Sequence, residues 1–404
     1  MKIGNKIRLY PNNEQATYFA KACGVSRFAY NWGLARWNEM AQARRECKQN
    51  KSPTLCRLSA ELNAIKDEQF PWMREVTKCA PQHALMNLDR AWKRYFDYKQ
   101  GKLKLKTGVP SFKRRREGDG SFYLENQVFR ITDTHIYVSK LGRVRMAQPL
   151  RYPATKLLSC TISATAGQWY ASVSYETPVE PAKVENQDVV GVDLGIKALA
   201  TLSTGEVFEG PKAGKAAAKR LARLQRSASR KVKGSANRRK ANFKVARLHD
   251  RITNRRHDAL HKLTTRLTRI YGVIVIEDLN VKGMVKNHCL AKSLADQSFG
   301  EFRRQLEYKS AMRGNRLVVV DRFFPSSKTC SNCGNVVETL LLGQRTYTCD
   351  ACGMVKDRDH NAALNLAASS AVTACGVEGS GRTRKRTVKP STTKQEVNNV
   401  VSYV

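Results

Sequence analysis

The sequence predicts a multidomain α/β protein, and three observations lead to this fold class. The chain has 404 residues, more than one hydrophobic core usually serves. Helical periodicity dominates residues 13–110, and short runs of alternating apolar and polar residues follow. After residue 188, strand patterns alternate with helix patterns. Four cysteines cluster in two closely spaced pairs within this last part. We therefore expect two or three domains.

The N-terminal part is expected to combine a helical lobe with a β-rich module. Lys2–Tyr10 alternates like a strand, and a long helical pattern then runs from Glu14 to about Arg45. Further helices are expected around Leu58–Lys66 and from Pro81 to about Tyr98. Short alternating runs between Phe122 and Tyr175, interrupted by Gly and Pro, predict a barrel-like β module.

A basic loop lies between the expected helices and the β module. Residues 101–120 are dense in Lys, Arg and Gly, a composition typical of a loop that faces phosphate groups. Its consecutive cations, which we expect to contact nucleic acid, are Lys113, Arg114, Arg115 and Arg116.

The C-terminal half alternates strand patterns with a long basic segment. Val189–Leu202 is expected as one buried strand, followed by a turn and a second strand. Two more strands are expected at Val273–Leu279 and Leu317–Phe324. Between the second and third strands, Pro211–Ile270 carries 20 Lys and Arg against two acids, which predicts a helical hairpin with a strongly basic face.

The charge balance indicates a polyanionic partner. The chain has 72 Lys and Arg against 34 Asp and Glu, a formal net charge of +38. Nucleic acid is the obvious polyanion to neutralise it, whereas a solvated basic surface and an acidic membrane are the alternatives. No run of 18 apolar residues occurs, and Met1–Tyr10 lacks the apolar core of a signal peptide. We therefore expect an intracellular protein.

Two cysteine pairs predict a structural zinc site. Each is a Cys-x-x-Cys followed by glycine, and fifteen residues separate them, a spacing typical of zinc ribbons. The expected ligands are Cys330, Cys333, Cys349 and Cys352. A closed shell of four thiolates leaves no open position, so we expect scaffolding or nucleic-acid contact and no catalysis by zinc.

Three carboxylates in apolar surroundings predict a second metal site. Asp193 lies inside the pattern VGVDLG, Glu277 ends VIVIED, and a third acid, Asp359 or Asp357, opens DRDHNAALNL. Acids in such strands are costly unless something pairs with them, and divalent metal is the natural partner. Carboxylates that converge on such ions are typical of phosphodiester hydrolysis. Taken singly, each acid has an ordinary explanation: Asp193 as a turn residue, Glu277 as an ion-pair partner and Asp359 as a helix cap.

Ordered motifs then connect the C-terminal half to a known family. They are GVDLGIK at Gly191–Lys197, EDLN at Glu277–Asn280, FGEFRRQLEYKS at Phe299–Ser310, FPSSKTCSNCG at Phe324–Gly334, CDACG at Cys349–Gly353 and DRDHNAALNL at Asp357–Leu366. Looser matches in the N-terminal half are RLYPNNEQ at Arg8–Gln15, SRFAYN at Ser26–Asn31 and GVPSFKRRR at Gly108–Arg116. In these motifs the chain resembles the TnpB family, the transposon-encoded (OrfB-type) RNA-guided DNA endonucleases related to type V CRISPR effectors.

The resemblance implies a helical recognition lobe, a wedge β-barrel and an RNase H-like RuvC nuclease domain interrupted by the zinc ribbon. The expected boundaries are 1–12 for the first barrel strand, 13–110 for the recognition lobe, 111–182 for the rest of the barrel, 188–325 and 357–372 for the nuclease domain, 326–356 for a ribbon that binds target nucleic acid, and 376–404 for a disordered basic tail.

The resemblance also assigns site residues. Asp193, Glu277 and Asp359 match the catalytic acids, Asp359 being chosen over Asp357 because the family's acid directly precedes x-Asn-Ala-Ala. They would hold Mg²⁺, expected as two ions, beside the structural Zn²⁺. Lys78 and Gln82 match positions that contact the motif beside the target. Other expected nucleic-acid contacts are Arg220, Arg223, Arg238, Arg239 and Lys328.

The implied activity is RNA-guided, metal-dependent DNA cleavage that makes double-strand breaks at guide-matched targets next to a short adjacent motif and supports transposon maintenance. The implied partners are a transposon-derived guide RNA and double-stranded DNA, with no membrane, for a monomer in the prokaryotic cytoplasm associated with the nucleoid. Two alternatives are a nuclease-dead RNA-guided DNA-binding regulator and a guide-independent transposase with an RNase H-like triad.

Overall fold

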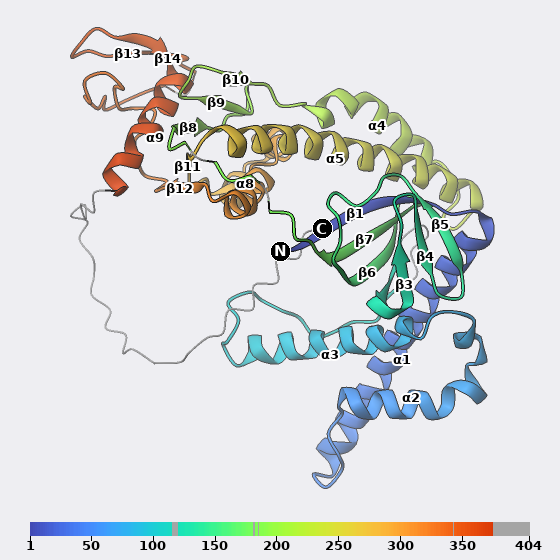
Figure 1. Ribbon diagram of the computed structural model, residues 1–404. Coiled ribbons are helices and arrows are strands. Elements are labelled where there is room, and N and C mark those ends of the chain that lie inside the picture. The colour runs from blue at the N-terminus through green and yellow to red at the C-terminus, as the bar shows by residue number, and fades with distance from the viewer. Residues whose placement is uncertain (115–119, 181, 185, 342, 375–404) are drawn as a thin grey trace. The chain divides into compact units, whose positions relative to one another are not determined.

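The computed structural model describes residues 1–114, 120–180, 182–184, 186–341 and 343–374. Contacts divide the described residues into two compact units, 1–179 and 180–374, which are treated separately (Figure 1). The predicted tail at 376–404 and the predicted contacts Arg115 and Arg116 lie outside the described residues. No helix within the described ranges is long and apolar enough to cross a membrane.

The first unit is built on a seven-stranded antiparallel sheet in the order β2-β6-β7-β1-β5-β4-β3. Its strands are β1 (Lys2–Tyr10), β2 (Gly120–Glu125), β3 (Phe129–Ile131), β4 (His135–Val138), β5 (Gly142–Met146), β6 (Lys156–Thr165) and β7 (Gln168–Glu176). Side chains alternate along β1, where Ile3, Ile7 and Leu9 are buried. The first predicted strand and the β-rich region are confirmed, and the wedge barrel stays a prediction.

Helices accompany this sheet in the first unit. They are α1 (Asn13–Glu46), α2 (Leu55–Gln69) and α3 (Cys79–Lys99), with 3-10 turns at Pro71–Glu75 and Asn126–Val128. α1 begins at a capping box in which the Asn12 side chain accepts from Gln15 N at 2.8 Å. Phe19 of α1 packs against Phe122 and Trp169 of the sheet. The three predicted helices are confirmed, with ends that shift by one to three residues.

The second unit contains a five-stranded sheet in the order β10-β9-β8-β11-β12. Its strands are β8 (Val189–Asp193), β9 (Ala200–Leu202), β10 (Val207–Phe208), β11 (Val273–Glu277) and β12 (Arg316–Val320). β8, β11 and β12 are parallel, and β9 and β10 run antiparallel. Val273–Ile276 of the central β11 is buried throughout, as expected for a parallel strand that is covered on both faces.

Helices cover both faces of this sheet. They are α4 (Ala213–Ser229), α5 (Ala236–Ile270), α6 (Val281–Met284), α7 (His288–Gln297), α8 (Phe299–Arg313) and α9 (Arg358–Ala374), and the ribbon adds β13 (Thr346–Thr348) and β14 (Val355–Asp357). On one face Ile274 packs with Leu263 of α5 and Phe302 of α8. On the other, Val275 packs with Leu366 of α9. The sheet is thus enclosed, and its carboxyl edge carries the candidate site.

The single strand predicted over Val189–Leu202 is wrong, because the chain reverses within it. β8 ends at Asp193, and β9 returns antiparallel with Leu202 opposite Val192. The Ser203 N–H then donates to the Gly191 carbonyl at 2.9 Å. Since both strands are buried, the apolar run continues through the reversal and hides it from hydrophobicity patterns. Asp193 therefore ends a strand instead of lying within one.

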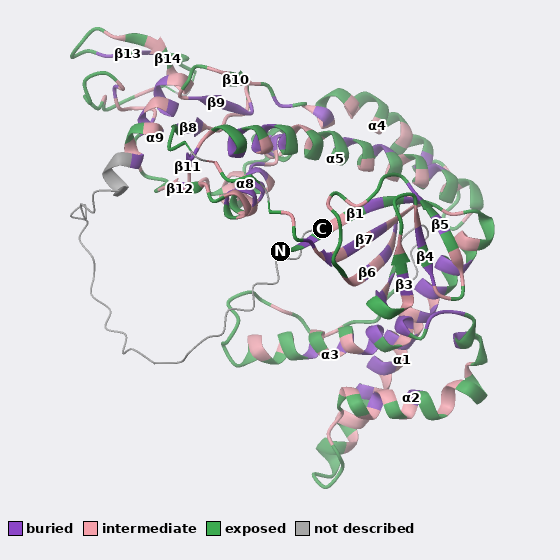
Figure 2. Cartoon of the chain, viewed as in Figure 1, coloured by how far each residue is buried: buried purple, intermediate pink, exposed green. Residues whose placement is uncertain are grey.

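The basic segment forms the predicted helical hairpin, α4 and α5. Leu248 and Ile252 belong to a narrow apolar stripe on α5, and much of the remaining helix surface is exposed (Figure 2). The buried Asp296 of α7 holds the hairpin, since its carboxylate accepts from Gly214 N at 2.8 Å and from Arg256 Nη2 at 2.7 Å. A charged pair therefore fixes the base of a largely cationic element.

α9 lies so close to β8 that a side chain on Gly191 has no room. An added Cβ would stand 2.0 Å from the Ala363 carbonyl oxygen and 2.6 Å from the Ala367 nitrogen. Both are backbone atoms of α9, so only movement of the helix would relieve the clash. The missing side chain of Gly191 thus sets the distance between sheet and helix.

Gly191→Ala is expected to push α9 from the sheet and to lower the free energy of unfolding by about 1–3 kcal/mol, as overpacking does in other cores. Gly300→Ala in α8 is the matched control, because nothing lies within 4 Å of its Cβ position. Thermal denaturation compares the two variants. A Gly191→Ala protein that melts like the unaltered protein would contradict the close packing.

Candidate active site

Two of the predicted catalytic carboxylates end neighbouring parallel strands. Asp193 is the last residue of β8 and Glu277 the last residue of β11. Val192 pairs with Ile276 in the parallel register, so the residues that follow them emerge side by side. This carboxyl edge of a parallel sheet is where α/β proteins commonly bind ligands.

α9 brings the third predicted carboxylate to the same edge. Asp359 lies in its first turn, and the helix packs on β8 at Gly191. Burial, then the charge of Asp359, then that of Glu277 raise the pKa of Asp193 to about 7. Because like charges shift a pKa strongly only at short range, the three acids share one electrostatic environment.

This environment fits a divalent cation. A cation would relieve the mutual repulsion that raises the pKa of Asp193, and magnesium prefers oxygen ligands. Among the described residues, however, only the four cysteines form a group of ligand atoms that all lie within 4.8 Å of one another. The carboxylate trio is therefore more open than the cysteine cluster.

The structure separates the roles of Asp357 and Asp359, which the residues alone left open. Asp357 Oδ1 accepts from the N–H groups of Asp359 and His360, at 2.9 and 3.0 Å. Asp357 thus caps the beginning of α9. The charges of both acids raise the pKa of Asp193, that of Asp359 more than that of Asp357, and Asp359 stays the candidate ligand.

Asp278, the residue after Glu277, connects three elements, a role that no sequence pattern predicted. Its carboxylate accepts from Arg303 of α8 at 2.6 Å and pairs with Arg322, which follows β12. Hydrogen bonds from Arg303 and then Arg322 lower the pKa of Asp278. Burial and then the Asp278 charge raise the pKa of Glu277. Its adjacency to Glu277 was the available sequence signal, but its arginine partners lie far along the chain.

The four predicted zinc ligands form one cluster. The Sγ atoms of Cys330 and Cys352 are 3.7 Å apart, and those of Cys333 and Cys349 are 3.5 Å apart. Sulfurs at the corners of a tetrahedron with Zn–S bonds of about 2.3 Å would be about 3.8 Å apart. The cluster therefore has the size of a tetrahedral structural zinc site.

Two equivalent turns shape this cluster. In each turn the N–H of the glycine after the second cysteine donates to the carbonyl of the first cysteine at 2.9 Å, which joins Gly334 to Cys330 and Gly353 to Cys349. Both glycines have positive φ, 77° and 69°. Glycine is favoured there because other residues rarely adopt this conformation.

Two buried asparagines of α9 connect the helix to the ribbon by hydrogen bonds. Asn361 Oδ1 accepts from Ser331 N at 2.9 Å, and its Nδ2 donates to the Thr329 carbonyl at 2.7 Å. Asn365 Nδ2 donates to the carbonyls of Ser326 and Thr329 at 2.8 and 2.6 Å. Asn361 lies two residues after Asp359, so the ribbon helps to position the helix that carries this carboxylate.

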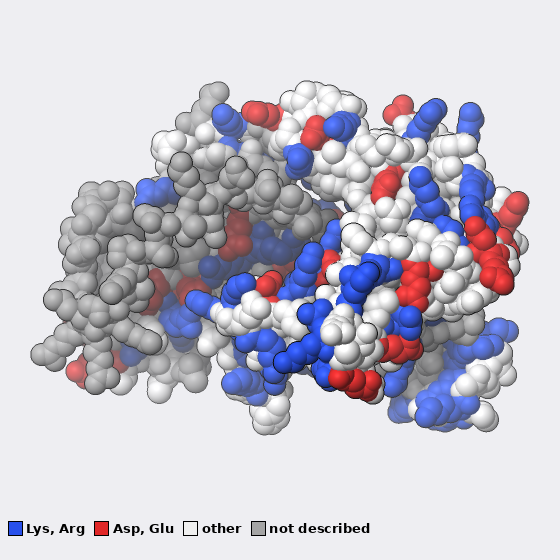
Figure 3. Space-filling model, turned by 90° about the horizontal axis from the view of Figure 1, so that it is seen from below, with Lys and Arg blue, Asp and Glu red and all other residues white. Residues whose placement is uncertain are grey.

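The predicted hairpin contacts fall into two groups. Arg220 and Arg223 of α4 and Arg239 of α5 are exposed. Arg238 instead donates to the Lys231 carbonyl at 3.0 Å and closes the hairpin turn. On the face of the molecule in Figure 3, Lys and Arg side chains clearly outnumber Asp and Glu, as the net charge requires.

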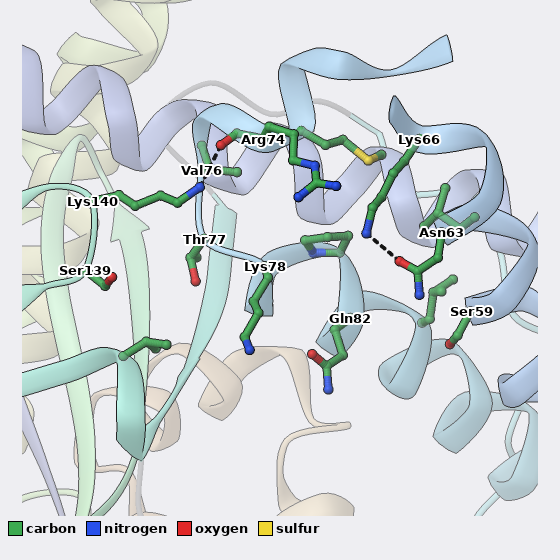
Figure 4. Close-up of a pocket in the computed structure, with 15 residues that line it drawn as sticks. Ser59, Asn63, Lys66, Arg74, Val76, Thr77, Lys78, Gln82, Ser139 and Lys140 are labelled. Carbon is green, nitrogen blue, oxygen red and sulfur yellow. Dashed lines mark hydrogen bonds between the residues drawn. The ribbon is translucent and has the colours of Figure 1, made fainter. Parts of the chain in front are cut away.

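Lys78 and Gln82 line one pocket of the first unit, with a volume of about 640 Å³. Both side chains are exposed and extend in the same direction (Figure 4). Nearby, Lys66 donates to Asn63 and Lys140 donates to the Arg74 carbonyl. The pocket is thus lined by several cations, and Lys78 and Gln82 lie side by side in it, as a contact to nucleic acid needs.

Other predicted contacts are partly engaged within the protein. Lys113 Nζ lies 4.0 Å from the Tyr30 ring centre, and burial lowers the pKa of Lys113. Arg114 is exposed. Lys328 Nζ donates to the Glu338 carbonyl at 2.7 Å within the ribbon. Lys113 and Lys328 therefore have structural contacts that the sequence did not indicate.

Three family models match the chain. They are OrfB_IS605, described as "Probable transposase", at residues 172–288; "Cas12f1-like, TNB domain" at 299–366; and "Helix-turn-helix domain" at 1–46. Over 1–46 the structure has the strand β1 followed by the single long helix α1, so that last description does not match the observed elements.

Relatives match over nearly the whole chain. A Streptomyces pristinaespiralis protein, provisionally assigned as an RNA-guided DNA endonuclease, is 40% identical over 93% of this chain and 91% of its own length. InsQ of Escherichia coli K12, with the same assignment, is 34% identical over 94% and 96%. A solved Cas12f1–sgRNA–target DNA complex covers 91% of this chain and 99% of its own at 14% identity, and its TM-score of 0.33 is too low to support an argument.

Cys349→Ser is expected to abolish zinc binding, about one ion per chain, and to loosen the attachment of the ribbon to α9. Elemental analysis measures the zinc, and hydrogen exchange of the Ser331 N–H, which bonds Asn361, reports the attachment. Cys289→Ser changes an exposed cysteine of α7 outside the cluster and is the control. Slow exchange at Ser331 in the zinc-free variant would contradict the coupling.

Asp193→Asn is expected to stabilise the metal-free protein increasingly as pH rises. The folded-state pKa of Asp193, about 7, lies above the ordinary value of 3.8. Ionised Asp193 therefore lowers the free energy of unfolding, by an amount that grows from about pH 4 and reaches its full size above about pH 7. The melting temperature should rise by at least ~2 °C at pH 8 and by less at pH 5.5. The exposed Asp258→Asn is the control, and an Asp193→Asn gain that does not vary with pH would contradict the assignment.

Proposed function

The chain belongs to the OrfB_IS605 (TnpB) family, and on this premise we propose that it is an RNA-guided DNA endonuclease. The proposed enzyme uses divalent metal at a RuvC-type centre and makes double-strand breaks at guide-matched targets beside a short adjacent motif. The observation that carries the proposal is the convergence of Asp193, Glu277 and Asp359 at one sheet edge, with the pKa of Asp193 raised to about 7.

The chain's own residues prepare this centre. Asp193 and Glu277 project from rigid parallel strands, and Asp359 from a helix that the ribbon anchors. Asp278 holds the end of β11 through Arg303 and Arg322. Magnesium ions bound by the trio would supply an activated water and stabilise the leaving oxygen of a phosphodiester. Preorganised oxygen ligands reduce the rearrangement that cleavage requires.

Guidance by RNA agrees with the distribution of charge. If base pairing reads the sequence, the protein needs mainly phosphate contacts, which suits a net charge of +38 and a basic hairpin, α4–α5. We assign Arg220, Arg223 and Arg239 to such contacts. Lys78 and Gln82, which lie side by side in the lining of their pocket, are assigned to the motif beside the target.

The alternatives have less support. A nuclease-dead regulator has no need of three acids whose repulsion raises a pKa, yet this chain retains them. A transposase without a guide would show strand transfer on transposon-end DNA and no bound RNA. The strong identity to relatives assigned as RNA-guided endonucleases favours guided cleavage.

The decisive test is plasmid cleavage by protein purified with its co-expressed RNA. In magnesium, the unaltered complex is expected to linearise a plasmid that carries the guide match and adjacent motif. Asp193→Ala should lower the rate at least ~100-fold, because the metal centre loses a ligand. Asp188→Ala, which changes an exposed acid just before β8, should not.

The amount of copurified RNA per protein must be equal in all samples, so that a lower cleavage rate is not caused by loss of the guide. Guided binding by the unaltered protein without strand scission would favour the regulator. Strand transfer without RNA would favour the transposase. Equal cleavage by Asp193→Ala would refute the assigned centre.

A further inference from the structure

Phe323 is an apolar ring presented almost entirely to solvent. Its exposed fraction is 86%, the largest among the exposed large hydrophobic residues of the described chain. The side chain of the next residue, Phe324, instead packs against the core beside Val318 and Leu366. A single exposed apolar residue is ordinary on a protein surface. What calls for an explanation is the position of Phe323 and the hydrogen-bonded turn that carries it.

Hydrogen bonds fix the turn that carries Phe323. The Phe323 N–H donates to Asp321 Oδ1 at 2.8 Å, and the Phe324 N–H donates to the Asp321 carbonyl at 3.0 Å. The neighbouring Arg322 pairs with Asp278. An aspartate turn, an ion pair and the partly buried Phe324 therefore hold the backbone on both sides of the exposed ring.

The turn leaves the sheet at the edge that carries the catalytic candidates. β12 ends at Val320, which pairs with Glu277 in the parallel register, and the Asp278 N–H donates to the Val320 carbonyl at 2.9 Å. Phe323 follows three residues later. From strand spacing and chain reach, its Cα lies within roughly 15 Å of that of Glu277, a span of a few nucleotides.

The residues around Phe323 indicate which ligand would bind there. Arg322, the residue before Phe323, is 43% exposed and pairs with Asp278 through Nη2. An exposed ring next to an arginine, on a protein of +38 charge, suits a nucleotide, which offers a flat base and a phosphate. A base inside a duplex is already stacked on both faces, so the partner is an unpaired base.

We propose that Phe323 is a stacking platform for one unpaired base of the DNA strand that is being cut, and that it holds this strand in register with the carboxylate trio. The proposal deepens the proposed function and rests on it. Phe323 acts here as a positioning residue, because it touches the substrate away from the reacting phosphate. Arg322 adds charge at the adjoining backbone.

The first test combines protein variants with altered DNA. Phe323→Ala in the RNA-loaded protein is expected to slow single-turnover cleavage roughly 5- to 100-fold, the usual effect of losing one base stack. Phe323→Tyr should restore the rate and Phe323→Leu should not, since leucine keeps the apolar surface without a ring face. Val207→Ala, which truncates a 55%-exposed residue on the opposite edge strand β10, is the control.

Abasic nucleotides, placed singly around the cut, then identify the stacked base. At one position the abasic site should lower the cleavage rate of the unaltered enzyme as much as Phe323→Ala does. The two changes together should then lower the rate no further than either one alone. A merely distorted turn would slow all substrates equally and leave the two effects additive. Additivity at every position, or a fully active Phe323→Leu, overturns the proposal.

A binding measurement separates this proposal from the nuclease assignment. All five tryptophans of the chain precede residue 180, so emission added by Phe323→Trp reports the turn. In the RNA-loaded protein without magnesium, a single-stranded oligonucleotide should quench this added emission, and an abasic oligonucleotide of the same length should not. Quenching without cleavage would reject only the nuclease assignment. Cleavage by the unaltered protein with neither quenching nor abasic coupling would reject only the stacking platform.

Discussion

The close packing of α9 on β8 is the contact on which the candidate site depends. Gly191 permits it, because any side chain there would meet the backbone of α9. The contact brings the beginning of α9 to the strand that ends in Asp193, and so converts two strand-end acids into a group of three. A helix that lay farther from the sheet would leave Asp193 and Glu277 without a third partner.

The cysteine cluster and the candidate carboxylate site are linked through this same helix. The ribbon has no open coordination position of its own, yet its backbone carbonyls hold the side chains of Asn361 and Asn365. Packing on β8 sets the distance between α9 and the sheet, and hydrogen bonds to Asn361 and Asn365 connect the helix to the ribbon. Asp278 supplies the corresponding restraint on the strand side, where its two arginines connect β11 with α8 and the segment after β12.

The sequence predicted those features that have local signatures. Cysteine spacing identified the metal cluster, periodicity located the helices of the first unit and the basic hairpin, and acids in apolar strands indicated Asp193 and Glu277. Features that depend on long-range contacts escaped it. The reversal after Asp193 lies within one apolar run, the capping role of Asp357 depends on geometry, and the hydrogen bonds of Asn361 join residues about thirty positions apart.

The order of the site residues along the chain has a consequence for biosynthesis. Asp193 and Glu277 lie before the ribbon, and Asp359 follows it. During translation, the strand-end acids leave the ribosome first, then the cysteines, and then the last acid. A chain that stops before α9 therefore has no complete carboxylate trio, and Asn361 and Asn365 find their partners only in a folded ribbon. On the proposed function, this order makes the synthesis of α9 and the folding of the ribbon a safeguard against cleavage by incomplete protein.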